Sequence, residues 1–146
     1  MEGKKEHLGL KKEILIKKDV WERMLQHCMK EKPLEACGIL SGEAGKCEKI
    51  WEMQNIARSS YSFEMSQVEL ENKLQKIEKA KGQTLTGIYH SHPTAEPIPS
   101  QQDIENAHYH EAVYFIISLS KKYPRVKCYQ IIGKKCLPVR LKIFND

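Results

Sequence analysis

Apolar residues recur along the chain with two different periods, and together they predict short strands mixed with helices. Apolar positions three to four residues apart predict helices that begin at Asp19 and Ser66. Ser66 is followed three residues later by Glu69, which is typical of a capping box. The predicted strands are 14–16, 35–41, 47–57, 84–92, 112–120, 126–132 and 137–144, and the predicted helices are 19–32, 66–81 (apolar stripe Val68, Leu70, Leu74, Ile77) and 100–110.

The order of these elements has no regular strand–helix–strand alternation, so it predicts an α+β fold or a three-layer α/β/α sandwich. The chain has 146 residues, which is the usual size of one domain. We expect a single domain over residues 13–146. Residues 1–12 are polar and charged, which favours a flexible N-terminal tail. His27 is expected on the surface of the first helix.

Composition and charge restrict the class of partner. The net charge is only +5, and the lysine pairs are scattered without interleaved aromatic residues, so no nucleic-acid partner is expected. No apolar stretch reaches the ~20 residues of a membrane span, and the N-terminus lacks the apolar run of a signal peptide. The five cysteines form no C-x-x-C pair, and their odd number favours reduced thiols and a cytoplasmic location.

The candidate chemistry lies at the end of the predicted strand 84–92. His90 and His92 are two residues apart, so strand geometry projects both imidazoles from one face. Asp103, in the first turn of the next predicted helix, can supply an oxygen ligand. Two imidazoles and a carboxylate, with a fourth position left for water, form the donor set of a catalytic zinc site.

A second interpretation competes for the same aspartate. Ser100 and Asp103 have the spacing of an ordinary helix N-cap with an acidic residue at its third position, which needs no metal. An isolated H-x-H is also a weak signal of metal binding. The residues alone leave open whether the carboxylate caps the helix, binds a metal or does both.

The whole pattern resembles the motif of the JAMM (MPN-plus) zinc metalloproteases, in their compact single-domain prokaryotic form. Residues 90–93 read H-S-H-P and residues 100–103 read S-x-x-D with the family's spacing, and residues 35–42 match its upstream E-x-x-G-x-L-x-G. Residues 55–65, with Phe63, resemble the family's mid-domain stretch more weakly. The resemblance covers residues 14–132 and implies a cytidine-deaminase-like fold, in which a curved mixed sheet lies between helices.

The resemblance also implies roles for five residues. His90, His92 and Asp103 would bind one zinc ion, with water as the fourth ligand. Glu35 would hold and deprotonate this water, and Ser100 would hydrogen-bond the oxyanion of the tetrahedral intermediate. Zinc lowers the pKa of bound water to about 7 and polarises a carbonyl, which agrees with these roles.

Residue-level reasoning does not by itself select Glu35 as the base. Its apolar neighbours would raise the pKa of its carboxyl toward neutrality, but the residues alone favour an exposed charge at the end of a strand. Glu31, Glu43 and Glu64 are equal candidates on these grounds. Only the resemblance singles out Glu35.

The resemblance implies a metallopeptidase that cleaves a peptide or isopeptide bond at the C-terminal tail of a small ubiquitin-like, β-grasp sulfur-carrier protein. We expect this extended tail to add to an exposed sheet edge beside the metal. Three predicted strands fill most of the 43 residues after Asp103, which leaves no room for a second ubiquitin-gripping insertion. Two alternatives remain, a metal-free MPN-type interaction scaffold and a deubiquitinase-like isopeptidase. The sequence predicts no oligomeric state.

Overall fold

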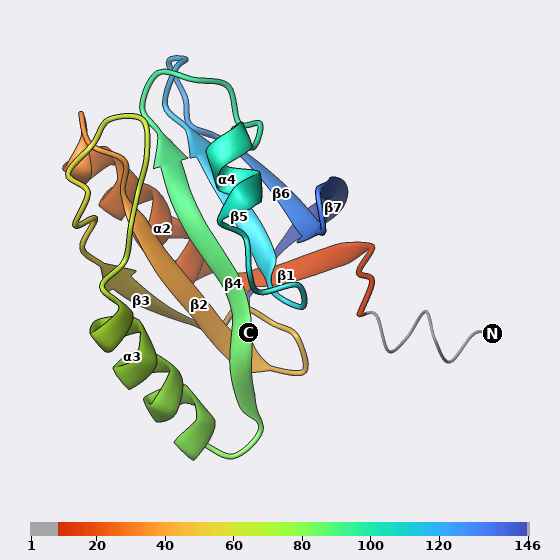
Figure 1. Cartoon of the computed structure of the whole chain (residues 1–146). Coiled ribbons are helices and arrows are strands. Elements are labelled where there is room, and N and C mark those ends of the chain that lie inside the picture. The colour runs from red at the N-terminus through yellow and green to blue at the C-terminus, as the bar shows by residue number, and fades with distance from the viewer. Residues whose placement is uncertain (1–8, 146) are drawn as a thin grey trace.

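The computed structural model describes residues 9–145, which form a curled, mixed seven-stranded sheet with three helices (Figure 1). In chain order these are β1 (Glu13–Lys17), α2 (Lys18–Glu31), β2 (Cys37–Glu43), β3 (Lys49–Met53), α3 (Gln67–Lys79), β4 (Gln83–His92), α4 (Gln101–Glu105), β5 (Val113–Ser118), β6 (Arg125–Ile132) and β7 (Lys135–Phe144). The strand order is β1-β7-β6-β5-β4-β2-β3. The predicted α+β class is therefore confirmed.

The sheet is mixed because two of its neighbouring pairs, β1 with β7 and β4 with β5, run parallel, whereas the others run antiparallel. Its two ends also meet. Ile16 of β1 forms a parallel bridge with Cys47, which precedes β3. The amide of Lys17 donates to the Cys47 carbonyl (2.9 Å), and the Cys47 amide donates to the Leu15 carbonyl (2.8 Å). These bonds curl the sheet and cover part of its edge.

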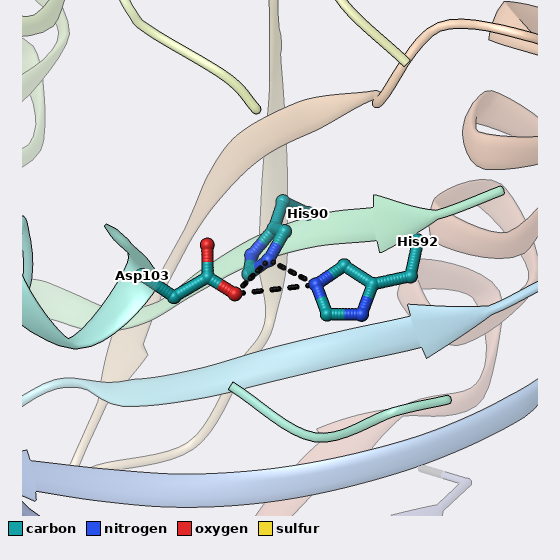
Figure 2. A group of neighbouring side chains, drawn as sticks. All are labelled: His90, His92 and Asp103. Atoms are coloured by element: carbon teal, nitrogen blue, oxygen red, sulfur yellow. Dashed lines mark hydrogen bonds and ion pairs between the residues drawn. The ribbon is translucent and has the colours of Figure 1, made fainter. Parts of the chain in front are cut away.

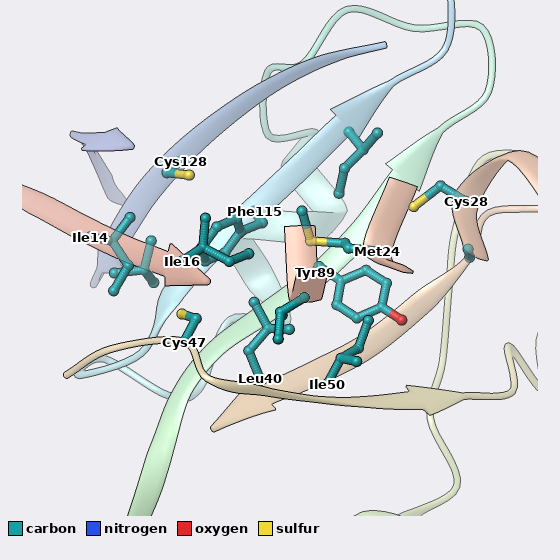
Figure 3. Packing of buried hydrophobic residues seen from close by; sticks show 14 of the residues in the cluster. Ile14, Ile16, Met24, Cys28, Leu40, Cys47, Ile50, Tyr89, Phe115 and Cys128 are labelled. Atoms are coloured by element: carbon teal, nitrogen blue, oxygen red, sulfur yellow. The ribbon is translucent and has the colours of Figure 1, made fainter. Parts of the chain in front are cut away.

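Helices cover both faces of the sheet, with α2 on one face and α3 and α4 on the other (Figure 1). On the first face Met24 of α2 packs among buried side chains that include Tyr89 and Phe115 (Figure 3). On the second face Ile77 of α3 packs in a cluster with Ile88. Full burial of each large apolar side chain stabilises the fold by about 1.5–3 kcal/mol.

Strand β4 lies inside the sheet, and its side chains alternate between the two faces. Ile88 belongs to the cluster under α3, and the next residue, Tyr89, belongs to the cluster under α2. His90 and His92 therefore share the face of Ile88, whereas Ser91 lies on the side of α2. The strand thus delivers both imidazoles to the face that α3 and α4 cover.

Every predicted strand and helix is present, but several boundaries differ. Asp19 lies inside the first turn of α2 and is not its cap, since Lys17 occupies that position without a side-chain hydrogen bond. Ser66 does cap α3, its hydroxyl accepting from the Glu69 amide. Val68, predicted in the apolar stripe of this helix, is 67% exposed. Helix α4 ends at Glu105, five residues earlier than predicted.

The prediction for His27 is wrong, because this residue is buried. Its Nδ1 is 2.6 Å from the Tyr89 hydroxyl, so a tertiary hydrogen bond satisfies the polar ring. Burial is the main cause that lowers the pKa of His27. The helical pattern could not reveal this contact, because Tyr89 lies 62 residues away along the chain.

Residues 1–8 of the predicted tail lie outside the described residues. Gly9 and Lys11 are bound to β6, since the Lys11 amide donates to Gln130 Oε1 (2.7 Å) and Gln130 Nε2 donates to the Gly9 carbonyl (2.6 Å). The cysteines are unpaired, four of them being buried. Within residues 9–145, no helix has the length and hydrophobicity that crossing a bilayer requires.

Candidate metal centre and active site

Two histidines and one aspartate converge where β4 ends (Figure 2). The Nε2 atoms of His90 and His92 lie 3.1 Å apart, and Asp103 Oδ2 is 3.1 Å from the first and 3.2 Å from the second. Both histidines are buried, and Asp103 is half-buried in the first turn of α4. Among residues 9–145, this is the group of His, Cys, Asp or Glu side chains whose ligand atoms are close enough to hold a metal ion.

The positions of the three donor atoms suit the binding of a divalent cation better than they suit hydrogen bonds among the three side chains when both histidines are neutral. His92 Nδ1 is 2.7 Å from the Glu96 carbonyl and donates to it, so the neutral ring directs an Nε2 lone pair at the Asp103 carboxylate. Two facing acceptors repel unless a cation or proton lies between them. Ligands of a tetrahedral zinc ion with bonds of about 2.0–2.1 Å lie about 3.3 Å apart, close to the separations found here.

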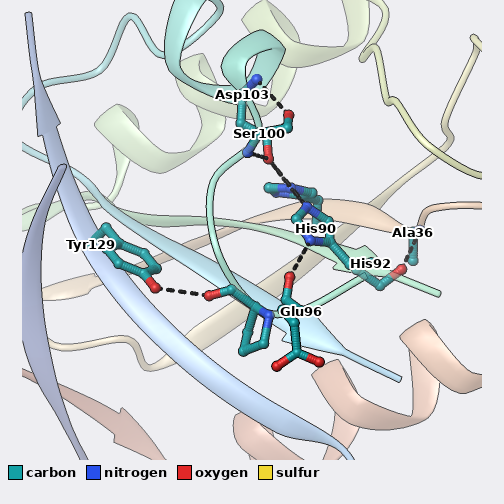
Figure 4. A network of polar contacts seen from close by, with 9 residues as sticks. Ala36, His90, His92, Glu96, Ser100, Asp103 and Tyr129 are labelled. Atoms are coloured by element: carbon teal, nitrogen blue, oxygen red, sulfur yellow. Dashed lines mark hydrogen bonds and ion pairs between the residues drawn. The ribbon is translucent and has the colours of Figure 1, made fainter. Parts of the chain in front are cut away.

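The loop between β4 and α4 orients His92 (Figure 4). The contacts from β5 and β6 that hold this loop are Ser118 Oγ to the Ala95 carbonyl (2.7 Å), the Tyr129 hydroxyl to the Pro97 carbonyl (2.8 Å) and Arg125 to the Glu96 carboxylate (2.9 Å). Burial alone would lower the pKa of His92, but the bonds to Asp103 and to the Glu96 carbonyl outweigh it and raise the pKa. The loop therefore sets which ring nitrogen of His92 faces Asp103.

Asp103 caps the helix and also faces the two histidines, so its geometry is compatible with both tasks between which the sequence could not decide. Its Oδ2 accepts from the Ser100 amide (2.9 Å), and its own amide donates to Ser100 Oγ (3.0 Å), which completes a capping box. The same Oδ2 faces the two imidazoles. Although burial opposes ionisation, the hydrogen bonds that His90 and His92 donate when their rings are protonated hold the pKa of Asp103 well below its ordinary value. Capping the helix thus aims the carboxylate at the histidines.

Glu35 is the buried member of the four glutamates that the sequence left as candidates; it is 3% exposed. The residue after it is bound to β4, since the Ala36 amide donates to Ser91 Oγ (2.8 Å) and the Ser91 amide donates to the Ala36 carbonyl (3.0 Å). Glu35 Oε1 is buried without a hydrogen-bond partner in the described chain. Burial raises the pKa of Glu35 to about 7, with His92 lowering and Asp103 raising it.

Ser100 is exposed, and its hydroxyl oxygen accepts from the Asp103 amide. This bond uses one lone pair of the oxygen and leaves the hydroxyl proton available for donation. The structure therefore places a hydrogen-bond donor beside the metal group. The helix cap and a contact to a substrate oxygen do not exclude each other.

Phe63 is a residue to which the sequence assigned no role. Its ring stacks on that of His90, with 4.6 Å between the centroids and an angle of 25° between the planes. The only signal for Phe63 in the sequence was the weak resemblance of residues 55–65. A loop that lies between β3 and α3 thus forms one wall of the site.

An apolar groove with a volume of about 470 Å³ lies beside the metal group. Phe63, Gln102, Asn106 and Tyr114 line both this groove and the small pocket at His90 and Asp103. The apolar side chains farther along the groove are Ile39, Met65, Leu70, Leu85, Ile88 and Tyr109. The groove therefore adjoins the site.

The prediction that a substrate tail adds to a sheet edge beside the metal does not fit this sheet. β4, which carries both histidines, is paired with β2 on one side and β5 on the other. β2 pairs with β4 as far as His90, and β5 pairs with it as far as His92, so β4 itself offers no open edge to a tail. The groove under α3 and α4 lies next to the site.

Comparison with known proteins shows that this chain is similar to one family, to curated peptidases and to a solved structure. The model of the family "prokaryotic homologs of the JAB domain" matches residues 17–132. The desampylase of Haloferax volcanii is 33% identical over 107 residues, covering 68% of this chain and 76% of that protein. The CysO-cysteine peptidase of Mycobacterium tuberculosis is 31% identical over 107 residues, covering 72% and 73%. The solution structure of a Desulfitobacterium hafniense protein superimposes with a TM-score of 0.80 at 27% identity, covering 91% of this chain and 94% of that one.

Proposed function

The chain belongs to the family of prokaryotic homologs of the JAB domain, and on this basis we propose that it is a zinc metallopeptidase. Its proposed substrate is the C-terminal tail of a small ubiquitin-like sulfur-carrier protein, cleaved at a peptide or isopeptide bond. The observation that carries the proposal is the convergence of His90, His92 and Asp103, together with Glu35, a buried carboxyl without a partner that interacts electrostatically with His92 and Asp103.

His90, His92 and Asp103 would hold the zinc ion. When bound, zinc supplies Lewis acidity, which polarises a carbonyl and makes water acidic enough to ionise near neutral pH. The contribution of the protein is to keep the three ligands in place before the ion arrives. The capping box aims Asp103, and the Glu96 carbonyl orients His92.

Glu35 would act as the general base and then as the general acid. A pKa of about 7 suits both tasks, because the carboxyl can take a proton from the attacking water and return it to the leaving amine near neutral pH. Its unpartnered Oε1 is free to bind this water. A glutamate with the ordinary pKa of 4.5 would be a weaker base, and near neutral pH it would seldom hold the proton that the leaving amine needs.

The Ser100 hydroxyl would donate a hydrogen bond to the carbonyl oxygen as negative charge develops there. The apolar groove would hold side chains of the substrate on one side of the scissile bond. A groove that already has its shape has no ordering cost of its own to add to that of the tail.

The relatives support the kind of substrate. One is named for cleavage between CysO and cysteine, and another is named a desampylase. The matched region of this chain covers more than two thirds of the length of each relative. The unpaired, buried cysteines favour a reducing compartment, so we propose that the reaction takes place in the cytoplasm.

The proposal is tested by metal analysis and hydrolysis assays on the same preparations. The parent should bind one zinc per chain and release the residues that follow a Gly-Gly sequence at the end of a β-grasp carrier. The His90→Ala and His92→Ala variants should lose zinc and activity, whereas His110→Ala, an exposed histidine outside the group, should keep both. Glu35→Gln should keep zinc and lose turnover by roughly 10²–10⁴-fold.

Each alternative has its own outcome in this experiment. A protein that folds and binds its carrier but takes up no zinc is the interaction scaffold. A protein that cleaves only an isopeptide bond between ubiquitin units is the deubiquitinase-like enzyme. Zinc that is retained after both histidines are replaced contradicts the assignment of the ligands.

A further inference from the structure

Asn55 lies in the loop between β3 and α3, and its side chain is 6% exposed. Its Nδ2 donates to the carbonyls of Glu35 (3.0 Å) and Ser62 (3.0 Å), with a longer contact to that of Ser59 (3.4 Å). Its Oδ1 accepts from the amides of Ala57 (3.0 Å) and Glu64 (3.1 Å). One buried amide therefore uses its full hydrogen-bonding capacity on the backbone.

These bonds matter because Glu35 precedes β2 and lies outside the ladder of the sheet. Its amide donates to the Ser59 carbonyl (2.9 Å), and its carbonyl accepts from Asn55. Both backbone groups of Glu35 are thus held by the loop of residues 55–64. The side chain of Asn55 organises this loop from within.

The metal ligands are held by other parts of the chain. His90 and His92 are fixed by the pairing of β4 with its neighbours, and Asp103 is fixed by the cap of α4. Asn55 has no hydrogen bond to any of the three. Its loss should therefore disturb the base more than the metal ligands, which the loop contacts through the Phe63 ring on His90.

We propose that Asn55 is a positioning residue that acts through Glu35, an inference that rests on the function proposed above. By fixing the peptide unit of Glu35 against the loop, Asn55 keeps the carboxyl at a constant distance from the metal group. A displacement of about 1 Å at a reacting group is enough to lower a rate about 10²-fold. The same bonds place Ser62, which lines the pocket at His90.

A double-mutant cycle tests this role, with Asn55→Ala measured in the parent and in Glu35→Gln. We expect Asn55→Ala to lower kcat by about 10²-fold in the parent, to leave the zinc Kd unchanged, and to cost almost nothing more in Glu35→Gln. Gln54→Ala, the exposed neighbour, is the matched control and should change neither value. An equal loss of kcat in both backgrounds, or a zinc Kd that rises in step with the loss, overturns the proposal.

Hydrogen exchange separates this proposal from the proposed function. In Asn55→Ala the amides of Glu35, Ala57 and Glu64 should exchange faster than in the parent and in Gln54→Ala, whether or not the protein cleaves a carrier. Unchanged exchange at these amides overturns the role of Asn55. A parent that hydrolyses nothing while these amides do respond contradicts only the proposed function. If Asn55→Ala does not fold, Asn55→Ser serves in the same cycle.

Discussion

At the scale of single residues, the site depends on polar groups that are buried at a cost. A buried polar atom without a hydrogen bond costs about 1–3 kcal/mol, and Glu35 Oε1 and His90 Nδ1 are both in this condition in the described chain. Asn55 is the opposite case, with every polar atom satisfied. Glu35 and His90 thus keep a polar atom available for chemistry, whereas Asn55 uses all of its polar atoms to hold the backbone in place.

The raised pKa of Glu35 predicts a pH-dependent stability of the metal-free protein. Between its ordinary value of 4.5 and about 7 the folded chain binds this proton more tightly than the unfolded chain does, so the free energy of unfolding falls as the pH rises. Glu35→Gln has no such proton. The free energy of unfolding of Glu35→Gln minus that of the parent should therefore be roughly 3 kcal/mol larger at pH 8 than at pH 4. Urea unfolding at both pH values with a chelator present checks this, and a constant difference contradicts it.

Ser100 allows its cap and its proposed catalytic contact to be separated. Ser100→Ala should lose about 0.5–2 kcal/mol of stability through the cap and lower kcat by roughly 10²–10³-fold through the lost donor. Ser100→Asp caps a helix well but repels an oxyanion, so it should melt near the parent temperature and be almost inactive. Melting curves, zinc content and kcat are measured together. An active Ser100→Asp would assign Ser100 to the cap alone.

At the scale of elements, the packing of β2 against β4 and against the turn that follows β2 explains two glycines of the E-x-x-G-x-L-x-G segment. A Cβ on Gly38 would lie 2.4 Å from the ring of Tyr89, which is buried and bonded to His27. A Cβ on Gly42 would lie 2.0 Å from the Lys46 carbonyl. Both glycines therefore make room for packing around β2 and need no role in the chemistry.

The steric role of Gly38 is testable by relieving the clash from the other side. Gly38→Ala should lower the free energy of unfolding by about 1–3 kcal/mol, because the Tyr89 ring must move in a packed core. In a Tyr89→Ala background the added methyl group finds space, so the same substitution should cost much less. Urea titrations of the parent, the two single variants and the double variant give the coupling free energy between Gly38 and Tyr89. An equal cost in both backgrounds contradicts this explanation.

At the scale of the whole molecule, the fold is stabilised by apolar side chains that are buried on both faces of the sheet. The metal group borders the second of these buried clusters through Phe63, which stacks on His90. The apolar surface that these clusters bury does not depend on the ion. Metal binding should therefore stabilise a chain that already folds by itself.

Zinc should raise stability by mass action alone. At a free zinc concentration 100 times the Kd, the expected gain is about 2.7 kcal/mol, and the chelated protein should still unfold in one cooperative transition. His92→Ala, treated in the same way, should show no gain. Calorimetry with and without a chelator measures both values. A chelated parent that has no unfolding transition would show that the fold requires the metal.

The sequence by itself determined the features that depend on near neighbours. Period-two geometry places His90 and His92 on one face, and the spacing of Ser100 and Asp103 produces the capping box. The apolar patterns located every strand and helix, although the ends of α2 and α4 differ, because terminal turns depend on weak local preferences.

Only the tertiary structure decided the features that depend on distant pairing. The burial of Glu35 follows from the attachment of Ala36 to Ser91, 55 residues away, and no local pattern distinguishes it from other glutamates. The contact of His27 with Tyr89 and the closed flanks of β4 likewise arise from the strand order. The physical reason is that burial and hydrogen-bond partners are set by which segments pack together, and a one-dimensional pattern encodes only that a segment has an apolar face.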